Sequence, residues 1–274
     1  MKKIFIKIMA ISVALILFNS CQDLNHPAYS DYKKDSNPVG GPLKFYVAFD
    51  GTTQDPLMNA VDSIRANFAT GNQLSFATGI SGMSIVGDSA KYVTYAKPND
   101  WASTSSSFTI AFWEKHAAKL APAEFVFSVA MPGNSVYNWC DACMFLLIDN
   151  NATTPIAKFY IYDKTGSDTW LVWDGNSAVT GILDGAWHHL AFVYDASTSG
   201  MTYYKDGVAY DTKKWGTHGP LNIDYKQVAG LHIGGASESR DSWMQSWRGN
   251  LDQFRMYNTA LTAAEVNALY TKKQ

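Results

Sequence analysis

Apolar and polar residues alternate along many short segments of this chain, and residues 187–195 are the clearest of them. There both alternating sets of positions are largely apolar or aromatic, which is typical of a strand that is buried on both faces. A short loop, residues 196–200, leads into a second run at 201–205, and Asp206-Gly207 then supplies a strong hairpin-turn sequence. We therefore expect this hairpin to lie in the middle of a sandwich.

Other short segments of the same kind follow one another from Pro42 onward, with turn-forming residues between them. This rhythm predicts an all-β sandwich or barrel. Residues 57–68 fit either a short helix or a long loop. The other expected strands are residues 44–49, 74–76, 83–86, 91–95, 107–116, 124–130, 143–149, 157–163, 169–174, 208–211, 230–234 and 249–257.

One helix is predicted at the end of the chain. Thr262 is suited to the N-cap position, and Glu265 stands three residues later, which together make a capping box. Val266, Leu269 and Tyr270 then supply an apolar face at helical spacing.

The first twenty residues have the pattern of an export signal. Lysines at positions 2, 3 and 7 precede an apolar run at 8–18, which is too short for a typical membrane span. The segment ends at Ser20-Cys21 and resembles a bacterial lipoprotein signal, in which the cysteine after a small residue is lipidated. An ordinary secretory signal with a chance cysteine is the alternative. Gln22 replaces the aspartate that retains such proteins at the inner membrane, so the resemblance implies the outer membrane of a Gram-negative bacterium.

Residues 22–41 separate this signal from the first expected strand. They are polar, contain proline and glycine, and show no periodicity, which indicates a flexible tether. Roughly twenty residues of such a chain span on the order of 25 Å. We therefore expect a signal peptide at 1–20, a lipidated tether at 21–41 and one β-sandwich domain at 42–274.

The composition narrows the range of partners. Of the 274 residues, 47% are hydrophobic and 17% are charged, which is ample for a large core. The net charge of −2 creates no general field that would attract nucleic acid, so we do not expect a nucleic-acid partner. Contact with a membrane is expected through the lipid anchor.

Several motifs, in this order, carry a family resemblance. They are Phe49-Asp50-Gly51, residues 106–113, 183–195, 204–207 and 231–234, and the last strand with its helix from residue 249. The set resembles the laminin-G-like branch of the concanavalin A-like lectin/glucanase superfamily. That resemblance implies a jelly-roll sandwich of two antiparallel sheets. It also implies a carbohydrate- or protein-binding module, although some relatives are glycosidases or lyases.

The glutamates argue against glycosidase chemistry. Retaining glycosidases of this superfamily carry paired carboxylates on one strand, as Glu-x-Asp-x-x-Glu or Glu-x-Asp-x-Glu, and they need two carboxyl groups about 5 Å apart. None of the four glutamates has such a partner in the sequence. His188 and His189 are adjacent on a strand and point to opposite faces, so they cannot act on one substrate atom. A lyase that uses a tyrosine base stays open.

The resemblance also implies a calcium site. In relatives, calcium bridges the start of the sandwich and the last strand, and the matching acids here are Asp50 and Asp252. Main-chain carbonyls would complete the oxygen shell of a structural ion. The alternative is that Asp252 pairs with an arginine, such as Arg248 or Arg255, or caps a loop.

Two further cysteines, Cys140 and Cys143, follow Trp139. A thioredoxin-like site is disfavoured because no strand–helix–strand pattern surrounds them, and zinc would need additional ligands at metal spacing. Outside the cytoplasm, a small local disulfide between the two is expected, and it would brace the loop that carries Trp139.

The tryptophans divide into two groups. Trp113, Trp170 and Trp187 fall in expected strands, and we expect them in the core. Other tryptophans lie in loops, where sugars can stack on an exposed indole, although each could instead fold back over the sandwich edge. Neighbouring polar residues would orient the ligand. The predicted ligand-binding residues are Trp139, Trp215, Arg240, Asp241, Trp243 and Trp247.

Together these features predict a non-catalytic carbohydrate-binding lipoprotein, for which an accessory role in polysaccharide capture is one hypothesis. A protein-interaction or adhesion module that uses the same loops is the alternative. A glycosidase or polysaccharide lyase with an unrecognised site is a third hypothesis.

Overall fold

The computed structural model describes residues 41–50, 57, 59–61, 66–67, 74–96, 98–117, 123–132, 139–149, 154–236 and 243–273. The predicted signal peptide, the lipidation site Cys21 and the tether up to residue 40 lie outside these residues, so they stay predictions. The two α-helices within the described ranges have four and ten residues, and neither is long and apolar enough to cross a bilayer.

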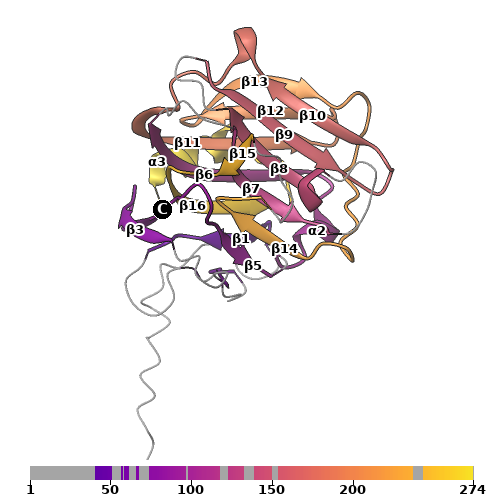
Figure 1. Ribbon diagram of the computed structural model, residues 1–274. Coiled ribbons are helices and arrows are strands. Elements are labelled where there is room, and N and C mark those ends of the chain that lie inside the picture. Colours follow the sequence, from indigo (N-terminus) through magenta and orange to yellow (C-terminus); the bar gives the residue numbers. More distant parts are fainter. Residues whose placement is uncertain are drawn as a thin grey trace, which may run out of the picture. The chain divides into compact units, whose positions relative to one another are not determined.

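Two sheets make up the described part of the chain, and Figure 1 shows their strands. Sheet A has the order β13-β12-β11-β6-β16-β4-β3, with β1 paired to β16 outside this order. Its strands pair antiparallel. The bounds are β1 Leu43–Val47, β3 Ser75–Thr78, β4 Met83–Val86, β6 Phe108–Ala117, β11 Asp184–Asp195, β12 Gly200–Lys205, β13 Val208–Lys214 and β16 Asn250–Tyr257.

Sheet B has the order β10-β9-β8-β7-β14-β5-β2, and β15 pairs with β7 outside this order. The β15–β7 pair is parallel, whereas the other pairs of this sheet are antiparallel. The bounds are β2 Ala66–Asn67, β5 Val93–Tyr95, β7 Ala123–Ala130, β8 Ala142–Asp149, β9 Ile156–Tyr162, β10 Asp168–Trp173, β14 Gly230–Ile233 and β15 Met244–Ser246. Short helical turns are α2 Trp101–Thr104, η1 Trp139–Asp141 and η2 Gly175–Ser177.

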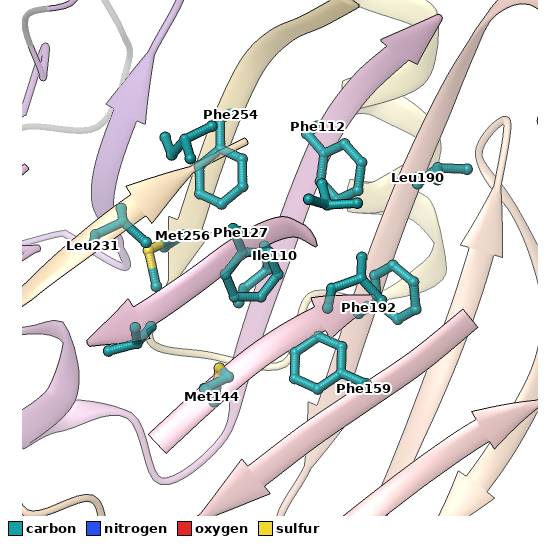
Figure 2. Close-up of a cluster of buried hydrophobic side chains, with 14 of the residues drawn as sticks. Ile110, Phe112, Phe127, Met144, Phe159, Leu190, Phe192, Leu231, Phe254 and Met256 are labelled. Carbon is teal, nitrogen blue, oxygen red and sulfur yellow. The ribbon is translucent and has the colours of Figure 1, made fainter. Parts of the chain in front are cut away.

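The main core lies between the two sheets. Figure 2 shows phenylalanines from both sheets pointing toward one another. Phe127 of sheet B lies 5.6 Å, between ring centroids, from Phe254 of sheet A, and Phe159 lies 5.4 Å from Phe192. Burying one such side chain contributes roughly 1.5–3 kcal/mol. Interlocked aromatic rings therefore hold the layers together, as the predicted two-sheet jelly roll requires.

β11 lies inside sheet A between β12 and β6, as the doubly apolar pattern predicts. Its inward face contributes Leu190 and Phe192 to the main core. On its outward face, Ala191 and Val193 form a smaller cluster with Val266 of α3, Ala263–Lys272. The helix therefore covers the outer face of sheet A, and the strand is buried on both sides.

The capping box of α3 is confirmed. Thr262 Oγ1 accepts a hydrogen bond from the Glu265 backbone N–H at 3.3 Å, and the Thr262 backbone N–H donates to Glu265 Oε2 at 2.8 Å. The expected strands are also present, mostly within two residues of their predicted bounds. β15 was not expected, because the sequence Met-Gln-Ser has no strand-like alternation. The segment at 57–68, left open between helix and loop, is described only in part.

Candidate functional site

The outer face of sheet B carries a layer of aromatic side chains. Phe145, Tyr160 and Trp170 come from the adjacent strands β8, β9 and β10, at positions that the strand register brings side by side. The Phe145 and Tyr160 rings are stacked with centroids 4.8 Å apart, and Trp170 meets Tyr160 at 5.1 Å. No helix covers this layer in the described part of the chain, in contrast to the outer face of sheet A.

Two tryptophans from separate loops border this layer. Trp139 of η1 is 45% exposed, and its ring meets Trp170 edge-on with centroids 5.8 Å apart. Trp243, directly before β15, is 42% exposed, and the Lys158 ammonium of β9 lies 5.7 Å from its ring centroid. Large exposed indoles are uncommon unless they serve binding, so this pair marks the outer face of sheet B as the candidate site.

The residues next to the two tryptophans touch each other. The Cys140 Sγ atom lies 3.7 Å from the Met244 Sδ atom. Met244 is buried in the same cluster as Phe125 and Phe145, on the outer side of sheet B. Two loops that are about a hundred residues apart in sequence are therefore packed on one support. We call the surface formed by Trp139, Trp170 and Trp243 the aromatic face, and the Tyr160 ring that Trp170 contacts is buried.

Charged groups on the aromatic face are few and partly paired. Lys158 Nζ forms an ion pair with Asp149 Oδ2 at 2.7 Å beside Trp243. Asp168 lies near Tyr160, and burial, followed by the Asp168 charge, raises the pKa of the Tyr160 phenol. These groups can donate and accept hydrogen bonds at the edge of the indole surfaces, where they would orient a ligand that stacks on the rings.

A second candidate site joins Asp50 and Asp252, the predicted calcium ligands, through the turn at residues 79–82. Asp252 Oδ2 accepts a hydrogen bond from Ile80 N at 2.8 Å, and Asp50 Oδ1 accepts one from Met83 N at 3.0 Å. A Cβ atom at Gly82 would lie 1.9 Å from Asp50 Oδ1, so only glycine leaves room for this approach. The sequence prediction that the two acids lie together is consistent with this arrangement.

The Asp252 carboxylate is fully buried, and its Oδ1 atom has no hydrogen-bond partner. Burial, and then the nearby Asp50 charge, raise the pKa of Asp252 to about 7. Neither Arg248 nor Arg255 pairs with it: Arg248 binds Glu124, and Arg255 lies over the Tyr46 ring. A buried carboxylate with a spare oxygen fits a hard cation such as calcium, with oxygen atoms of the turn as further ligands. Within the described residues, no three His, Cys, Asp or Glu side chains lie together in a group that could hold a metal ion.

A protein-family model described as the concanavalin A-like lectin/glucanases superfamily, Laminin_G_3, matches residues 87–267. This chain belongs to that superfamily. The match begins directly after β4, ends within α3, and includes the central hairpin and the closing strand. No curated protein matches the sequence.

Solved structures with this superfamily fold include domain 4 of an extracellular arabinanase from Geobacillus stearothermophilus, determined in complex with arabinotriose. It is 17% identical, with a TM-score of 0.58, and the match covers 83% of this chain and 98% of that one. The binding domain of botulinum neurotoxin serotype G is 12% identical, with a TM-score of 0.60, and the match covers 84% of this chain and 51% of the other. The binding domain of botulinum neurotoxin DC, in complex with rat synaptotagmin II, is 12% identical, with a TM-score of 0.58. That match covers 86% of this chain and 52% of the other. At these identities the likeness shows the fold.

Two of the predicted ligand-binding tryptophans lie elsewhere in the concanavalin A-like sandwich. Trp247 is only 1% exposed and packs against His116, so the prediction that it contacts a ligand is wrong. Trp215 is half-buried at the edge of the main core and stacks on His218 with centroids 3.5 Å apart, away from the aromatic face. Arg240 and Asp241 lie outside the described residues.

The predicted disulfide is not formed, since no bond joins Cys140 to Cys143. Cys140 lies in η1 and packs toward the outer cluster of sheet B, whereas Cys143 in β8 is part of the main core. The two thiols therefore face opposite sides of one sheet. Burial raises the pKa of the Cys143 thiol to about 12.

The tryptophans expected in the core have three different positions. Trp113 is buried, but on the outer face of sheet A, where it stacks on Tyr270 of α3. Trp187 is half-buried, and Trp170 is part of the aromatic face. Lys158, Tyr160 and Trp170 were missed as site residues. The alternation of lysine and tyrosine along β9 was the available signal, since it places Lys158 and Tyr160 on the same side of the strand.

Proposed function

We propose that this protein is a non-catalytic glycan-binding module. The observation that carries the proposal is the pair of exposed indoles, Trp139 and Trp243, on the outer side of sheet B in a concanavalin A-like sandwich. The flat apolar faces of sugar rings stack on such indoles, and polar groups at the edge fix the hydroxyls. Lys158 and Asp149 supply those polar groups next to Trp243.

Two structures with the same fold support a sugar as the ligand class. The arabinanase domain was solved with arabinotriose, and a botulinum neurotoxin of type C depends on two ganglioside molecules for cell entry. The described glutamates also fit a binding role, since Glu114 and Glu124 are buried and Glu265 caps α3.

The test compares glycan binding by the wild-type protein with binding by Trp139→Ala and Trp243→Ala. Each stacked ring is worth roughly 1–2 kcal/mol, so each variant should bind about tenfold more weakly or worse. Tyr225→Ala is the matched control, because Tyr225 is 44% exposed and has Lys164 Nζ 5.5 Å from its ring centroid. Wild-type protein that binds no plant, microbial or host glycan on an array, or variants that bind like wild type, would count against the proposal.

A protein-binding or adhesion module is the second candidate. The same exposed indoles suit a protein partner, and the neurotoxin DC binding domain was solved with synaptotagmin II. Capture of a specific outer-membrane protein that is lost in Trp139→Ala, by a protein that is inert toward glycans, would favour this candidate.

We place the module on a bacterial outer-membrane lipoprotein, on the strength of the N-terminal sequence that ends at Cys21. Metabolic labelling with a fatty acid should mark the wild-type protein and leave Cys21→Ser unlabelled. Fractionation of the wild-type protein with the inner membrane would contradict the outer-membrane assignment.

Calcium is part of the proposal as a structural ion. Asp50 and Asp252 would hold it, and its charge would compensate two carboxylates that now crowd one turn. The ion would tie the 79–82 turn to the last strand of sheet A, and no contact with the glycan is needed.

A further inference from the structure

The segment that carries Trp243 crosses from one sheet to the other. β15 pairs with the first residues of β7, with Gln245 opposite Glu124, and the chain then enters β16 of sheet A. Along the crossing, Ser246 N donates to Ser89 O at 3.1 Å and Trp247 N donates to Gly234 O at 2.8 Å. Because β15 has only three residues, its pairing with β7 holds the segment weakly, and other contacts are needed to fix it.

Glu124 of β7 supplies those contacts from the interior. Its Oε2 atom accepts a hydrogen bond from Arg248 N at 2.9 Å, and its Oε1 atom contacts both Nε and Nη2 of Arg248. His116 of β6 completes the group, with Nε2 at 2.9 Å from Oε2. One carboxylate of sheet B therefore holds the main chain and the side chain of the crossing segment, together with a histidine of sheet A.

Burial makes this contact hard to replace. The Glu124 side chain is 1% exposed. Burial by itself raises the pKa of Glu124, but the hydrogen bonds and charge of His116 and the contacts with Arg248 outweigh it and lower the pKa overall. The carboxylate is thus ionised and satisfied, and a neutral replacement leaves the Arg248 guanidinium without its counter-charge.

We propose that Glu124 is a positioning residue for the aromatic face, because it fixes the crossing segment 244–248 and thereby the indole of Trp243. The inference rests on the proposed function for its effect on binding. Its structural part, the anchoring of 244–248, does not depend on any ligand. Glu124 does not touch the ligand surface, so its influence passes through Arg248 and β15.

The test is Glu124→Gln in the full-length protein, with Asp206→Asn as the matched control. Asp206 likewise binds a histidine, His188 Nδ1 at 2.9 Å, and a backbone N–H, His189 N at 3.0 Å, but it lies in the turn between β12 and β13 of sheet A. We expect Glu124→Gln to speed hydrogen exchange at the amides of residues 246–248 and to weaken binding of the array-selected glycan about tenfold. Asp206→Asn should leave both unchanged. If Glu124→Gln fails to fold, Arg248→Lys replaces it in the test, because lysine keeps the positive charge but cannot make the two-nitrogen contact. Hydrogen exchange and glycan binding are then measured on this variant.

Two results overturn the inference. One is unchanged exchange at residues 246–248 in Glu124→Gln, and the other is an equal loss of binding in Glu124→Gln and Asp206→Asn. The exchange measurement needs no ligand, so failure of the proposed function is seen separately, as absence of glycan binding by the wild-type protein.

Discussion

The Cys140 thiol and the Met244 thioether lie 3.7 Å apart on the outer side of sheet B. Each belongs to a loop that presents an exposed tryptophan, Trp139 in one case and Trp243 in the other. The sulfur pair packs against the aromatic layer below it. The spacing of the two indoles is therefore set by buried packing and does not require a direct contact between the rings.

Shortening Met244 should loosen both loops. Met244→Ala removes a buried side chain and should cost about 2–5 kcal/mol of unfolding free energy, because the neighbours cannot fill the cavity completely. Binding at the aromatic face should weaken as well. Met256→Ala is the control, since Met256 is equally buried but lies in the main core. Chemical denaturation gives the stability, and equal effects of the two variants on binding would contradict the role of Met244.

The two thiols should differ in reactivity. Cys140 is half-buried at the surface, whereas Cys143 is fully buried with its pKa raised to about 12, mainly by burial. Because the thiolate is the reacting form, an alkylating reagent near pH 8 should modify Cys140 and spare Cys143 in the native protein. Peptide mass spectrometry locates the label. A protein in which neither thiol reacts until it is reduced would show that the disulfide forms after all.

The strand pattern could be predicted from the sequence because alternation reports burial directly. The two faces of β11 were both apolar, and each is covered, by the main core on one side and by α3 on the other. The capping box at Thr262 is equally local, since all its contacts lie within three residues. Features that depend only on residues close together in the chain can therefore be predicted from the sequence.

The candidate site was only partly predictable, because it depends on long-range packing. Trp243 and Trp247 are four residues apart in the same loop sequence, yet one is exposed and the other is buried against His116. The segment between them, β15, is positioned by its pairing with β7, which the local sequence does not encode. The cysteine pair shows the same dependence: Cys140 lies in η1 and Cys143 in β8, and they join clusters on opposite sides of sheet B.

His188 of β11 should make the stability of the protein depend on pH. Its Nδ1 atom lies 2.9 Å from Asp206 Oδ2 and its Nε2 atom lies 3.2 Å from Asp184 Oδ1. The hydrogen bond with Asp206 is the main cause that raises the pKa of His188. Glu114 lies directly opposite His188 on β6 and is buried, with no hydrogen-bond partner for its carboxyl oxygens. The pair should stabilise the fold by about 1 kcal/mol, since both groups are partly exposed.

The direction of this effect follows from the raised pKa. Protonated His188 stabilises the folded state fully below the unfolded value of about 6.5, and the gain is lost as the pH rises through the higher folded value. The stability gap between wild type and Asp206→Asn should therefore be wider at pH 6 than at pH 9 in urea titrations. A residual gap at pH 9 is expected, because Asp206 also accepts from His189 N. A gap that widens with pH would refute this assignment.

At Asp252, a proton and calcium should compete for the same carboxylate. Burial raises the pKa of Asp252 to about 7, so the folded protein holds a proton that the unfolded chain has released above about pH 4. In the absence of calcium, this group should therefore lower the stability as the pH rises from about 4 to beyond 7. Calcium replaces that proton, so its stabilising effect should be larger at pH 8 than at pH 5.5. At a hundredfold excess over its dissociation constant, the gain should be about 2.7 kcal/mol.

Thermal unfolding with calcium or with a chelator measures this difference at both pH values. Asp252→Asn should lose the calcium response and the associated pH slope together, because the amide neither titrates nor binds a hard cation strongly. Asp88→Asn is the control, since Asp88 is a largely exposed acid that forms a weak pair with Lys91. A calcium response that survives in Asp252→Asn would remove this residue from the site. A wild-type protein that is indifferent to calcium at pH 8 would instead mean that the spare Oδ1 atom is satisfied by water, and the pH slope would persist.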